Sequence, residues 1–135
     1  METVLSGIRS TGHLHLGNYF GALRNYIKMQ DEYNCFFFIA DLHSLTTHPH
    51  PDDFHSGVKT ILTEYLASGL DPEKSAIFVQ SDVPEIVELY VLLNMIAYKG
   101  ELERTAAFKE KVRKNPENVN AGLLTLTQSV GVIMG

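Results

Sequence analysis

Three short apolar runs along the chain have the length and composition of buried β-strands. They cover Thr3–Ile8, Cys35–Ala40 and Ser75–Gln80, and a polar residue follows each of them. Helical patterns fill the intervals, so strand and helix alternate along the chain. This order is typical of a parallel sheet with right-handed crossovers, and the sequence therefore predicts an α/β fold.

Apolar positions that recur every three to four residues predict helices after the first two strands. The first helix is expected over 16–30 and the second over about 52–68. The prolines in Thr46–Pro51 exclude regular structure there. Asp52 or Asp53 is therefore expected to cap the start of the second helix.

A third helix is expected to begin at Pro84, in its first turn, and to reach Tyr98. Its only strongly polar positions are Glu85, Glu88 and Asn94, so the helix is apolar almost all round. A helix of this kind belongs in an interior. We therefore expect it to be buried within the fold or against another subunit.

Composition narrows the class of protein. The 135 residues are 44% hydrophobic and 20% charged, which suits one globular domain. The single Cys35 excludes an internal disulfide and a cysteine-based zinc cluster, and it favours a reducing, cytoplasmic setting. No apolar run approaches the roughly 20 residues of a membrane span. The histidines His48, His50 and His55 are separated by prolines and lack further ligands at metal-site spacing, so no metal site is expected.

The charge is unevenly distributed. The net charge is −5, but Lys99–Lys114 holds six Lys or Arg and three Glu, which makes this segment +3 and the remainder −8. Such a basic patch can contact phosphates although the whole chain is acidic. The same residues also suit a solvated helix with Glu–Lys pairs, and the sequence leaves both interpretations open.

The segment Ser6–Asn18, which joins the first strand to the first helix, carries the candidate chemistry. Gly7, Gly12 and Gly17 allow tight turns and close approach to a ligand. The helix start near Gly17 offers free N–H groups and a positive dipole end, which favour phosphate. The spacing fits neither the dinucleotide-binding fingerprint nor the Walker A pattern.

This segment resembles a signature of a known enzyme family. The string Gly-x-x-x-Thr-Gly-x-Leu-His-Leu-Gly-Asn, over 7–18, is similar to the His-Ile-Gly-His region of class I aminoacyl-tRNA synthetases, in the form found in the tryptophanyl family. Further strings resemble that family in the same order along residues 1–125: Asp31–Asn34, Ile39–His43, Gly69–Pro72, Val79–Ser81, Gly100–Arg104, Phe108–Lys111 and Asn120–Leu124.

The resemblance implies a fold, a reaction and site residues. The fold would be a Rossmann-like parallel sheet flanked by helices, with an ATP- and amino-acid-binding half over 1–98 and a helical insertion and tail over 99–135. In the reaction, tryptophan and ATP would give tryptophanyl-adenylate and pyrophosphate, and tryptophan would then be transferred to tRNA. By resemblance, the residues that bind ATP are Arg9, Ser10, Thr11, Gly17 and Asn18, the catalytic ones are His15 and Asn18, and those that bind tryptophan are Leu5, Gly7, Asp41 and His43. ATP would bring Mg²⁺, no metal would be bound by the protein alone, and the partner would be a second copy in a homodimer.

The chain departs from the family pattern in three places. Ser10 stands where the family usually has proline, which should loosen the turn. After Thr125 the family's tyrosine and the aspartate that accepts the indole N–H are absent, and the second signature, Lys-Met-Ser-Lys-Ser, does not occur. We therefore expect a truncated or altered fragment that binds nucleotide weakly, activates tryptophan at a trace level, and charges no tRNA.

Two other functions fit the same residues. One is a fragment of the related tyrosyl-type synthetase. The other is a non-catalytic module for nucleotide binding or dimerisation. Binding of ATP alone would favour the module, and binding of both substrates would favour an enzyme.

Overall fold

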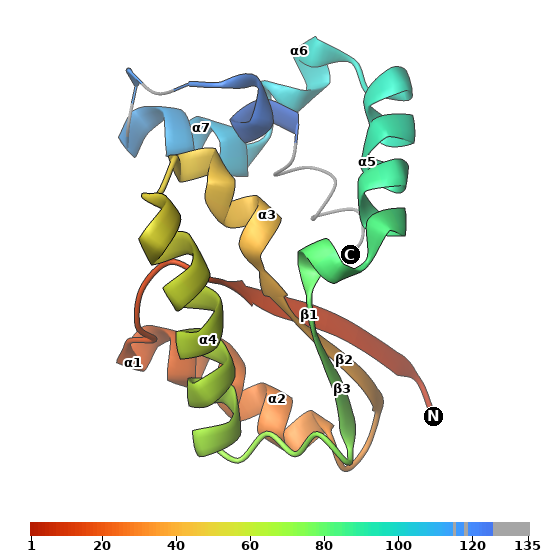
Figure 1. Cartoon of the computed structure of the whole chain (residues 1–135). Helices are drawn as coiled ribbons and strands as arrows, with labels where there is room; N and C mark the ends of the chain where they lie inside the picture. The colour runs from red at the N-terminus through yellow and green to blue at the C-terminus, as the bar shows by residue number, and fades with distance from the viewer. Residues whose placement is uncertain (115, 118, 126–135) are drawn as a thin grey trace.

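The computed structural model describes residues 1–114, 116–117 and 119–125, without the side chain of Ala107. Its centre is a parallel sheet of three strands in the order β1-β2-β3 (Figure 1), formed by β1 (Thr3–Arg9), β2 (Asn34–Ala40) and β3 (Ser75–Val79). The three predicted strands are confirmed. The register pairs Arg9 with Ala40 and Ile39 with Val79, so the carboxyl ends of the strands lie side by side.

The first predicted helix is confirmed over Leu16–Met29, with an irregular middle. It consists of α1 (Leu16–Asn18), a π-helical turn (Tyr19–Leu23) and α2 (Arg24–Met29). π-Helical turns are rare and are frequently found at functional sites. Apolar periodicity does not reveal such a turn. The wider π-helical turn accommodates one extra residue, so the residues before and after it still face the core.

The second helix begins earlier than predicted. A short helix α3 (Asp41–Ser44) and a 3₁₀ turn (Leu45–Thr47) follow β2, and α4 covers Pro51–Ala67. The expected cap at Asp52 or Asp53 is wrong. His50 is the N-cap, its Nδ1 accepts a hydrogen bond from the Asp52 backbone N–H, and Pro51 takes the first helical position, which proline favours because it needs no N–H there. The expected irregular stretch is correspondingly shorter.

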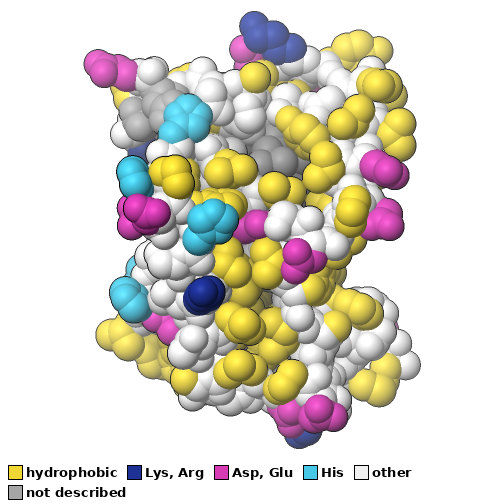
Figure 2. Space-filling model, viewed as in Figure 1, with side chains coloured by type: hydrophobic (Ala, Val, Ile, Leu, Met, Phe, Trp, Pro, Cys, Tyr) yellow, Lys and Arg dark blue, Asp and Glu magenta, His cyan; other side chains and the backbone are white. Residues whose placement is uncertain are grey.

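The last part of the described chain lies over the carboxyl ends of the strands (Figure 1). It contains a 3₁₀ turn (Gln80–Asp82), α5 (Pro84–Ile96), α6 (Lys99–Leu102) and α7 (Ala106–Lys114). Pro84 begins α5 as predicted. Burial of this helix within the fold is wrong for the described residues, because none of its residues is buried. Figure 2 shows its apolar side chains gathered on the surface.

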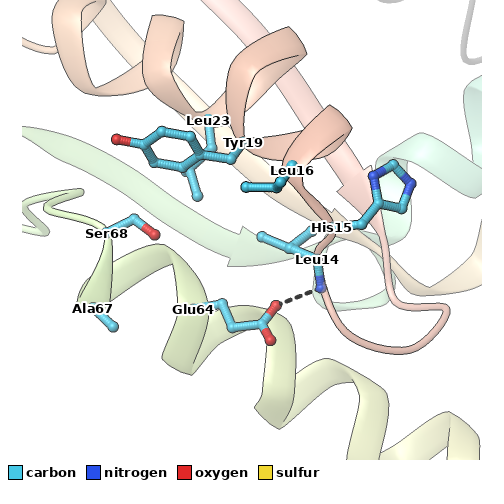
Figure 3. Close-up of a pocket in the computed structure, with 8 residues that line it drawn as sticks. All are labelled: Leu14, His15, Leu16, Tyr19, Leu23, Glu64, Ala67 and Ser68. Carbon is cyan, nitrogen blue, oxygen red and sulfur yellow. Dashed lines mark hydrogen bonds between the residues drawn. The ribbon is translucent and has the colours of Figure 1, made fainter.

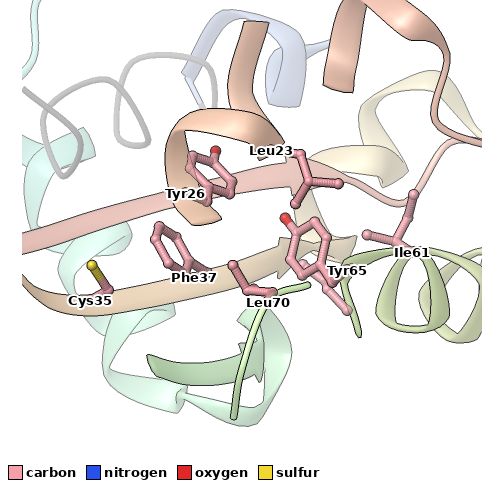
Figure 4. Close-up of a cluster of buried hydrophobic side chains, with 8 residues drawn as sticks. Leu23, Tyr26, Cys35, Phe37, Ile61, Tyr65 and Leu70 are labelled. Atoms are coloured by element: carbon pink, nitrogen blue, oxygen red, sulfur yellow. The ribbon is translucent and has the colours of Figure 1, made fainter. Parts of the chain in front are cut away.

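The core lies on one face of the sheet, between β2 and the helices α2 and α4 (Figure 4). Tyr26 stacks on Phe37 with ring centroids 4.4 Å apart, and Tyr65 is fully buried beside them. The remaining buried members are Leu23, Cys35, Ile39, Ile61 and Leu70. Side chains alternate along a strand, so the residues of β2 between these, such as Phe38, point to the other face.

Two expectations from the sequence remain, one on membrane spans and one on residues 126–135. In the described ranges, the structure contains no helix long and apolar enough to cross a membrane. The predicted departure at residues 126–135 lies outside the described residues.

Candidate functional site

The carboxyl ends of β1, β2 and β3 bring three buried polar residues together. Ser10, Asp41 and Gln80 each directly follow one strand, and each is at least nine-tenths buried. In open α/β sheets, ligands bind in the crevice beyond these ends. This edge of the sheet is therefore the place where the candidate site residues should meet.

Ser10 fixes the loop after β1 to the helix after β2. Its backbone N–H and its hydroxyl both donate to Ser44 Oγ, each at 3.1 Å, and Ser44 Oγ donates to the Ala40 carbonyl at 2.9 Å. A proline at position 10 has neither donor. The expected looser turn is therefore replaced by a hydrogen-bonded one. The Ser10 side chain points into this link, whereas Arg9 and Thr11 on either side of it are exposed.

The start of α1 is closed by a reciprocal pair of hydrogen bonds. His15 Nδ1 accepts from the Asn18 backbone N–H at 3.3 Å, and Asn18 Oδ1 accepts from the His15 backbone N–H at 3.1 Å. When neutral, His15 therefore carries its proton on Nε2, on an exposed ring. An exposed N–H donor at a helix start is suited to a phosphate oxygen.

Gly17 lies against the His15 ring. A Cβ at position 17 would come within 2.9 Å of His15 Nδ1 and Cε1, whereas a Cβ at Gly21, one turn later, would meet nothing within 4 Å. A side chain at position 17 would therefore displace the His15 imidazole from its hydrogen bond with the Asn18 backbone N–H, whereas glycine does not. The two glycines of this helix therefore differ in what a side chain would disturb.

Two of the residues expected to contact the amino acid lie on the face of the sheet opposite the core. Leu5 and Gly7 are half-buried on β1, on the side of the strand away from Val4 and Ile8, which pack on the core. A Cβ at Gly7 would lie 2.5 Å from the Phe38 carbonyl oxygen, so β1 and β2 approach closely only with glycine here.

Asp41 joins two of the strand ends. Its Oδ1 accepts from the Leu42 backbone N–H at 2.8 Å and from the Ser81 backbone N–H at 3.1 Å. Asp41 is 4% exposed, so the carboxylate is a buried brace between the loops after β2 and β3. Its Oδ1 therefore holds the backbone of both loops.

His43 is the most enclosed of the predicted ligand-binding residues apart from Ser10 and Asp41. It is 9% exposed, its backbone N–H donates to Gln80 Oε1 at 3.3 Å, and Lys111 Nζ lies 3.2 Å from its Nε2. Burial, together with the nearby charges of Lys111 and Arg9, lowers the pKa of His43 to about 4, and burial is the largest of these causes. The ring is therefore neutral at pH 7.

The basic segment Lys99–Lys114 was expected to be either a phosphate-binding patch or a solvated helix with Glu–Lys pairs, and its residues show features of both. Lys99 pairs with Glu103 at 3.3 Å and Lys114 with Glu110 at 2.6 Å, as in a solvated helix. Lys111 instead points towards the sheet and is half-buried. Burial lowers its pKa, and the charge of Arg9 adds to this. Two cations from distant parts of the chain thus face the same space, which favours an anion there.

A cavity of about 340 Å³ lies between α4 and the signature helix, which is α1 with the π-helical turn over 16–23 (Figure 3). Its walls are mainly apolar, and Glu64 of α4 lies at its edge. Glu64 accepts from the Leu14 backbone N–H and pairs with His13 Nδ1, each at 2.8 Å. Glu64 therefore holds the loop over 10–15, the signature loop, against α4. The other lining residues are His15, Leu16, Tyr19, Leu23, Ala67 and Ser68.

Three residues of the site were not assigned a role from the sequence: Ser44, Glu64 and Gln80 each hold a loop or a predicted site residue by a hydrogen bond. Lys111 was expected only as one member of the basic patch, and its contact with His43 was not predicted. Gln80 and Lys111 lie within strings that resemble the synthetase family, which is the signal that could have found them. Among the described residues, no group of three or more His, Cys, Asp or Glu is placed to hold a metal ion.

Known proteins with similar sequences belong to one enzyme family. Residues 1–128 match the model of the tRNA synthetases class I (W and Y). The chain is 72% identical over 125 residues to a tryptophan–tRNA ligase of Porphyromonas gingivalis, with 93% of this chain and 38% of that protein covered, and 49% identical over 123 residues to one of Clostridium tetani. It thus spans little more than a third of the length of these relatives.

Solved structures agree with the sequence matches. A tryptophanyl-tRNA synthetase of Campylobacter jejuni, complexed with ADP and tryptophan, has a TM-score of 0.88 and 34% identity, over 97% of this chain and 41% of its own. A tyrosyl-tRNA synthetase of Archaeoglobus fulgidus, complexed with tyrosine, has a TM-score of 0.80, 14% identity and 98% coverage of this chain. The second likeness shows the fold alone. The predicted Rossmann-like sheet is confirmed.

Proposed function

Since residues 1–128 match its model, this chain belongs to the class I tRNA synthetases of the tryptophan and tyrosine family, and we propose that it is the ATP- and amino-acid-binding part of a tryptophan–tRNA ligase. The observation that carries the proposal is the cluster at the strand ends. There the capped start of α1 follows β1, and the neutral, buried His43 follows β2 with the cations Arg9 and Lys111 close to it.

Tryptophan is preferred to tyrosine because of the relatives. The tryptophan–tRNA ligases named above share much of this sequence, whereas the tyrosyl enzyme shares little beyond the fold. The Campylobacter jejuni relative was solved with ADP and tryptophan, which supports a nucleotide site and an amino-acid site in this chain. Mg²⁺ would enter with ATP rather than occupy a site of the protein's own.

The proposed reaction is adenylyl transfer. An oxygen of the tryptophan carboxylate bonds to the α-phosphorus of ATP, and the bond from that phosphorus to the bridging oxygen breaks, so pyrophosphate leaves. The protein's contribution is positioning and charge stabilisation. In this assignment Arg9, Thr11 and the start of α1 face the phosphates, and the His15 Nε2–H donates to one of their oxygens.

The amino acid would lie between β1 and α3. Leu5 and Gly7 provide a flat floor on β1, and the His43 ring provides an aromatic wall beside it, which suits an indole. Ser10 supports the phosphate loop through Ser44, and Asp41 supports the loops around the pocket.

A glycine pair tests the nucleotide site. Gly17→Ala moves the His15 ring out of its cap, so we expect the affinity for ATP, measured by isothermal titration, to fall by about tenfold, as for one charge-assisted hydrogen bond. Gly21→Ala is the matched control and should leave that affinity unchanged. Helix stability should change little in Gly17→Ala, because alanine gains about what the lost cap costs.

Titration of the unaltered chain separates the alternatives. Heat from tryptophan with none from tyrosine supports the proposal. Preference for tyrosine would indicate a tyrosyl-type protein, and binding of ATP with neither amino acid would indicate a nucleotide-binding module. Equal ATP affinities for Gly17→Ala and Gly21→Ala would remove the phosphate from the signature loop.

The remaining partners belong to the same proposal. A tryptophan–tRNA ligase acts on tRNA, and the exposed lysines and arginines of α6 and α7 are suited to salt-sensitive phosphate contacts. The exposed apolar face of α5 is proposed as a homodimer contact. The buried free thiol of Cys35 suits a reducing compartment, so we place the protein in the cytoplasm.

A further inference from the structure

His43 and Lys111 are 68 positions apart in the sequence and lie in contact at the edge of the sheet. His43 belongs to α3, directly after β2, and Lys111 belongs to the basic helix α7. Lys111 Nζ is 3.2 Å from His43 Nε2. The proposed function explains why each residue lies near a ligand, and it gives no reason for their contact with each other.

The contact determines where the imidazole carries its proton. A lysine ammonium has three N–H donors and no acceptor. A nitrogen that it approaches within hydrogen-bond distance must therefore accept. The burial of His43 and the neighbouring charges of Lys111 and Arg9 favour the neutral ring, and a neutral ring that accepts at Nε2 carries its proton on Nδ1.

The other nitrogen is then a buried donor. His43 Nδ1 is inaccessible to solvent and has no hydrogen-bond partner among the described residues. A buried N–H without an acceptor costs free energy, so such a group in a stable protein calls for an explanation. His43 is nine-tenths buried and adjoins the strand ends where the ligand is placed. An acceptor on a bound ligand would satisfy the N–H.

We propose that Lys111 is a positioning residue that holds His43 in the Nδ1–H tautomer, so that this N–H donates to a carboxylate oxygen of the bound amino acid. The identity of the ligand rests on the proposed function. In tryptophan the indole N–H and the α-ammonium group are donors, and only the carboxylate offers strong acceptors. The basic helix therefore acts on amino-acid recognition through the histidine.

The tautomer is measured directly by long-range ¹H–¹⁵N NMR of the chain labelled at histidine. We expect the unaltered chain to show His43 protonated on Nδ1. Lys111→Met keeps the length of the side chain without its donors, so the Nε2–H form should appear. Lys111→Arg should restore the Nδ1–H form. Lys109→Met removes an exposed charge from the same helix and should leave the spectrum unchanged. An Nδ1–H tautomer that persists in Lys111→Met overturns the proposal.

Binding measurements test the ligand part. Lys111→Met should weaken tryptophan binding by about tenfold and should change binding of tryptamine, which lacks the carboxylate, by less than about twofold. Equal losses for both compounds would overturn the assignment to the carboxylate. In a His43→Leu background Lys111→Met should have no further effect, and a second tenfold loss there would show that Lys111 acts on the ligand directly and overturn its positioning role.

The two proposals fail in different ways. If tryptophan does not bind the unaltered chain, the proposed function and the carboxylate contact both fall. The NMR comparison still decides whether Lys111 sets the tautomer, because it needs no ligand.

Discussion

Ser10 illustrates how one side chain can replace another by a different physical means. Its family counterpart is usually proline, which stiffens a turn by restricting φ. Here the turn is stiffened by two hydrogen bonds to Ser44, and the carbonyl of Ala40 completes the chain of bonds. The family's proline cannot be restored without removing both donors.

Ser10→Pro should therefore destabilise this chain. Two buried hydrogen bonds are lost, and we expect the free energy of unfolding to fall by roughly 1–3 kcal/mol. Urea denaturation followed by circular dichroism measures it. Ser44→Ala removes the same bonds from the other side, so the double variant should lose little more than either single variant. Strictly additive losses would show that the two serines act independently.

His43 should make stability depend on pH. Its pKa is lowered from 6.5 to about 4 in the folded chain, chiefly by burial. Between these values the unfolded chain takes up a proton that the folded chain does not. The contribution of His43 is thus fully present above about pH 6.5, and up to about 3 kcal/mol of it is lost as the pH falls towards 4.

A comparison of variants isolates this effect from other titrations. In His43→Asn the loss of stability between pH 7 and pH 4.5 in urea denaturation should be smaller than in the unaltered chain. The control is His48→Asn, because His48 is exposed and has a positive φ of 50°, which asparagine tolerates. An equal pH dependence in all three proteins would mean that His43 is protonated as readily folded as unfolded.

At the scale of elements, the packing of α4 against the signature loop positions the site. Gly57 of α4 is buried, and a Cβ there would overlap the backbone carbonyl oxygen of Ser10. About two turns further on, Glu64 accepts a hydrogen bond from the Leu14 backbone N–H. The loop is therefore held at two points by one helix.

Gly57→Ala should force α4 and the loop apart. Overpacking of this kind typically costs roughly 1–3 kcal/mol of unfolding free energy, which thermal or urea denaturation can measure. Gly21→Ala is the matched control, since its Cβ meets nothing within 4 Å and its stability should be unchanged or slightly higher. Equal stabilities for the two variants would show that the loop yields to α4 without cost.

The elements also show what a sequence can predict. The three strands were found to within about one residue at either end, because short apolar runs between polar residues have few other interpretations. The start of α4 was misplaced, since Asp52 and Asp53 are good caps and only the fold decides that His50 serves. Contacts across the chain, such as Lys111 with His43 or Ser10 with Ser44, have no local signature. The sequence pointed to the signature loop and to His43 by resemblance, but their geometry required the structure.

At the scale of the whole molecule, α5 is the feature that the described fold leaves unexplained. It is the most apolar of the long helices, yet none of its residues is buried. Leu92, Met95 and Ile96 lie on one face at helical spacing and are 59%, 75% and 73% exposed. Side chains of this size on one exposed face usually mark a contact with another molecule.

We expect this face to mediate self-association, in keeping with the proposed homodimer. Charge placed there must be desolvated in the contact, so the double variant Leu92→Glu/Met95→Glu should sediment as a monomer at concentrations where the unaltered chain associates. Leu45→Glu makes the same kind of change on another surface, at a residue that is 46% exposed, and should associate like the unaltered chain. Sedimentation velocity over a hundredfold range of concentration distinguishes the cases. A monomer throughout in the unaltered chain, or association that survives both substitutions in α5, would place the dimer contact elsewhere or remove it.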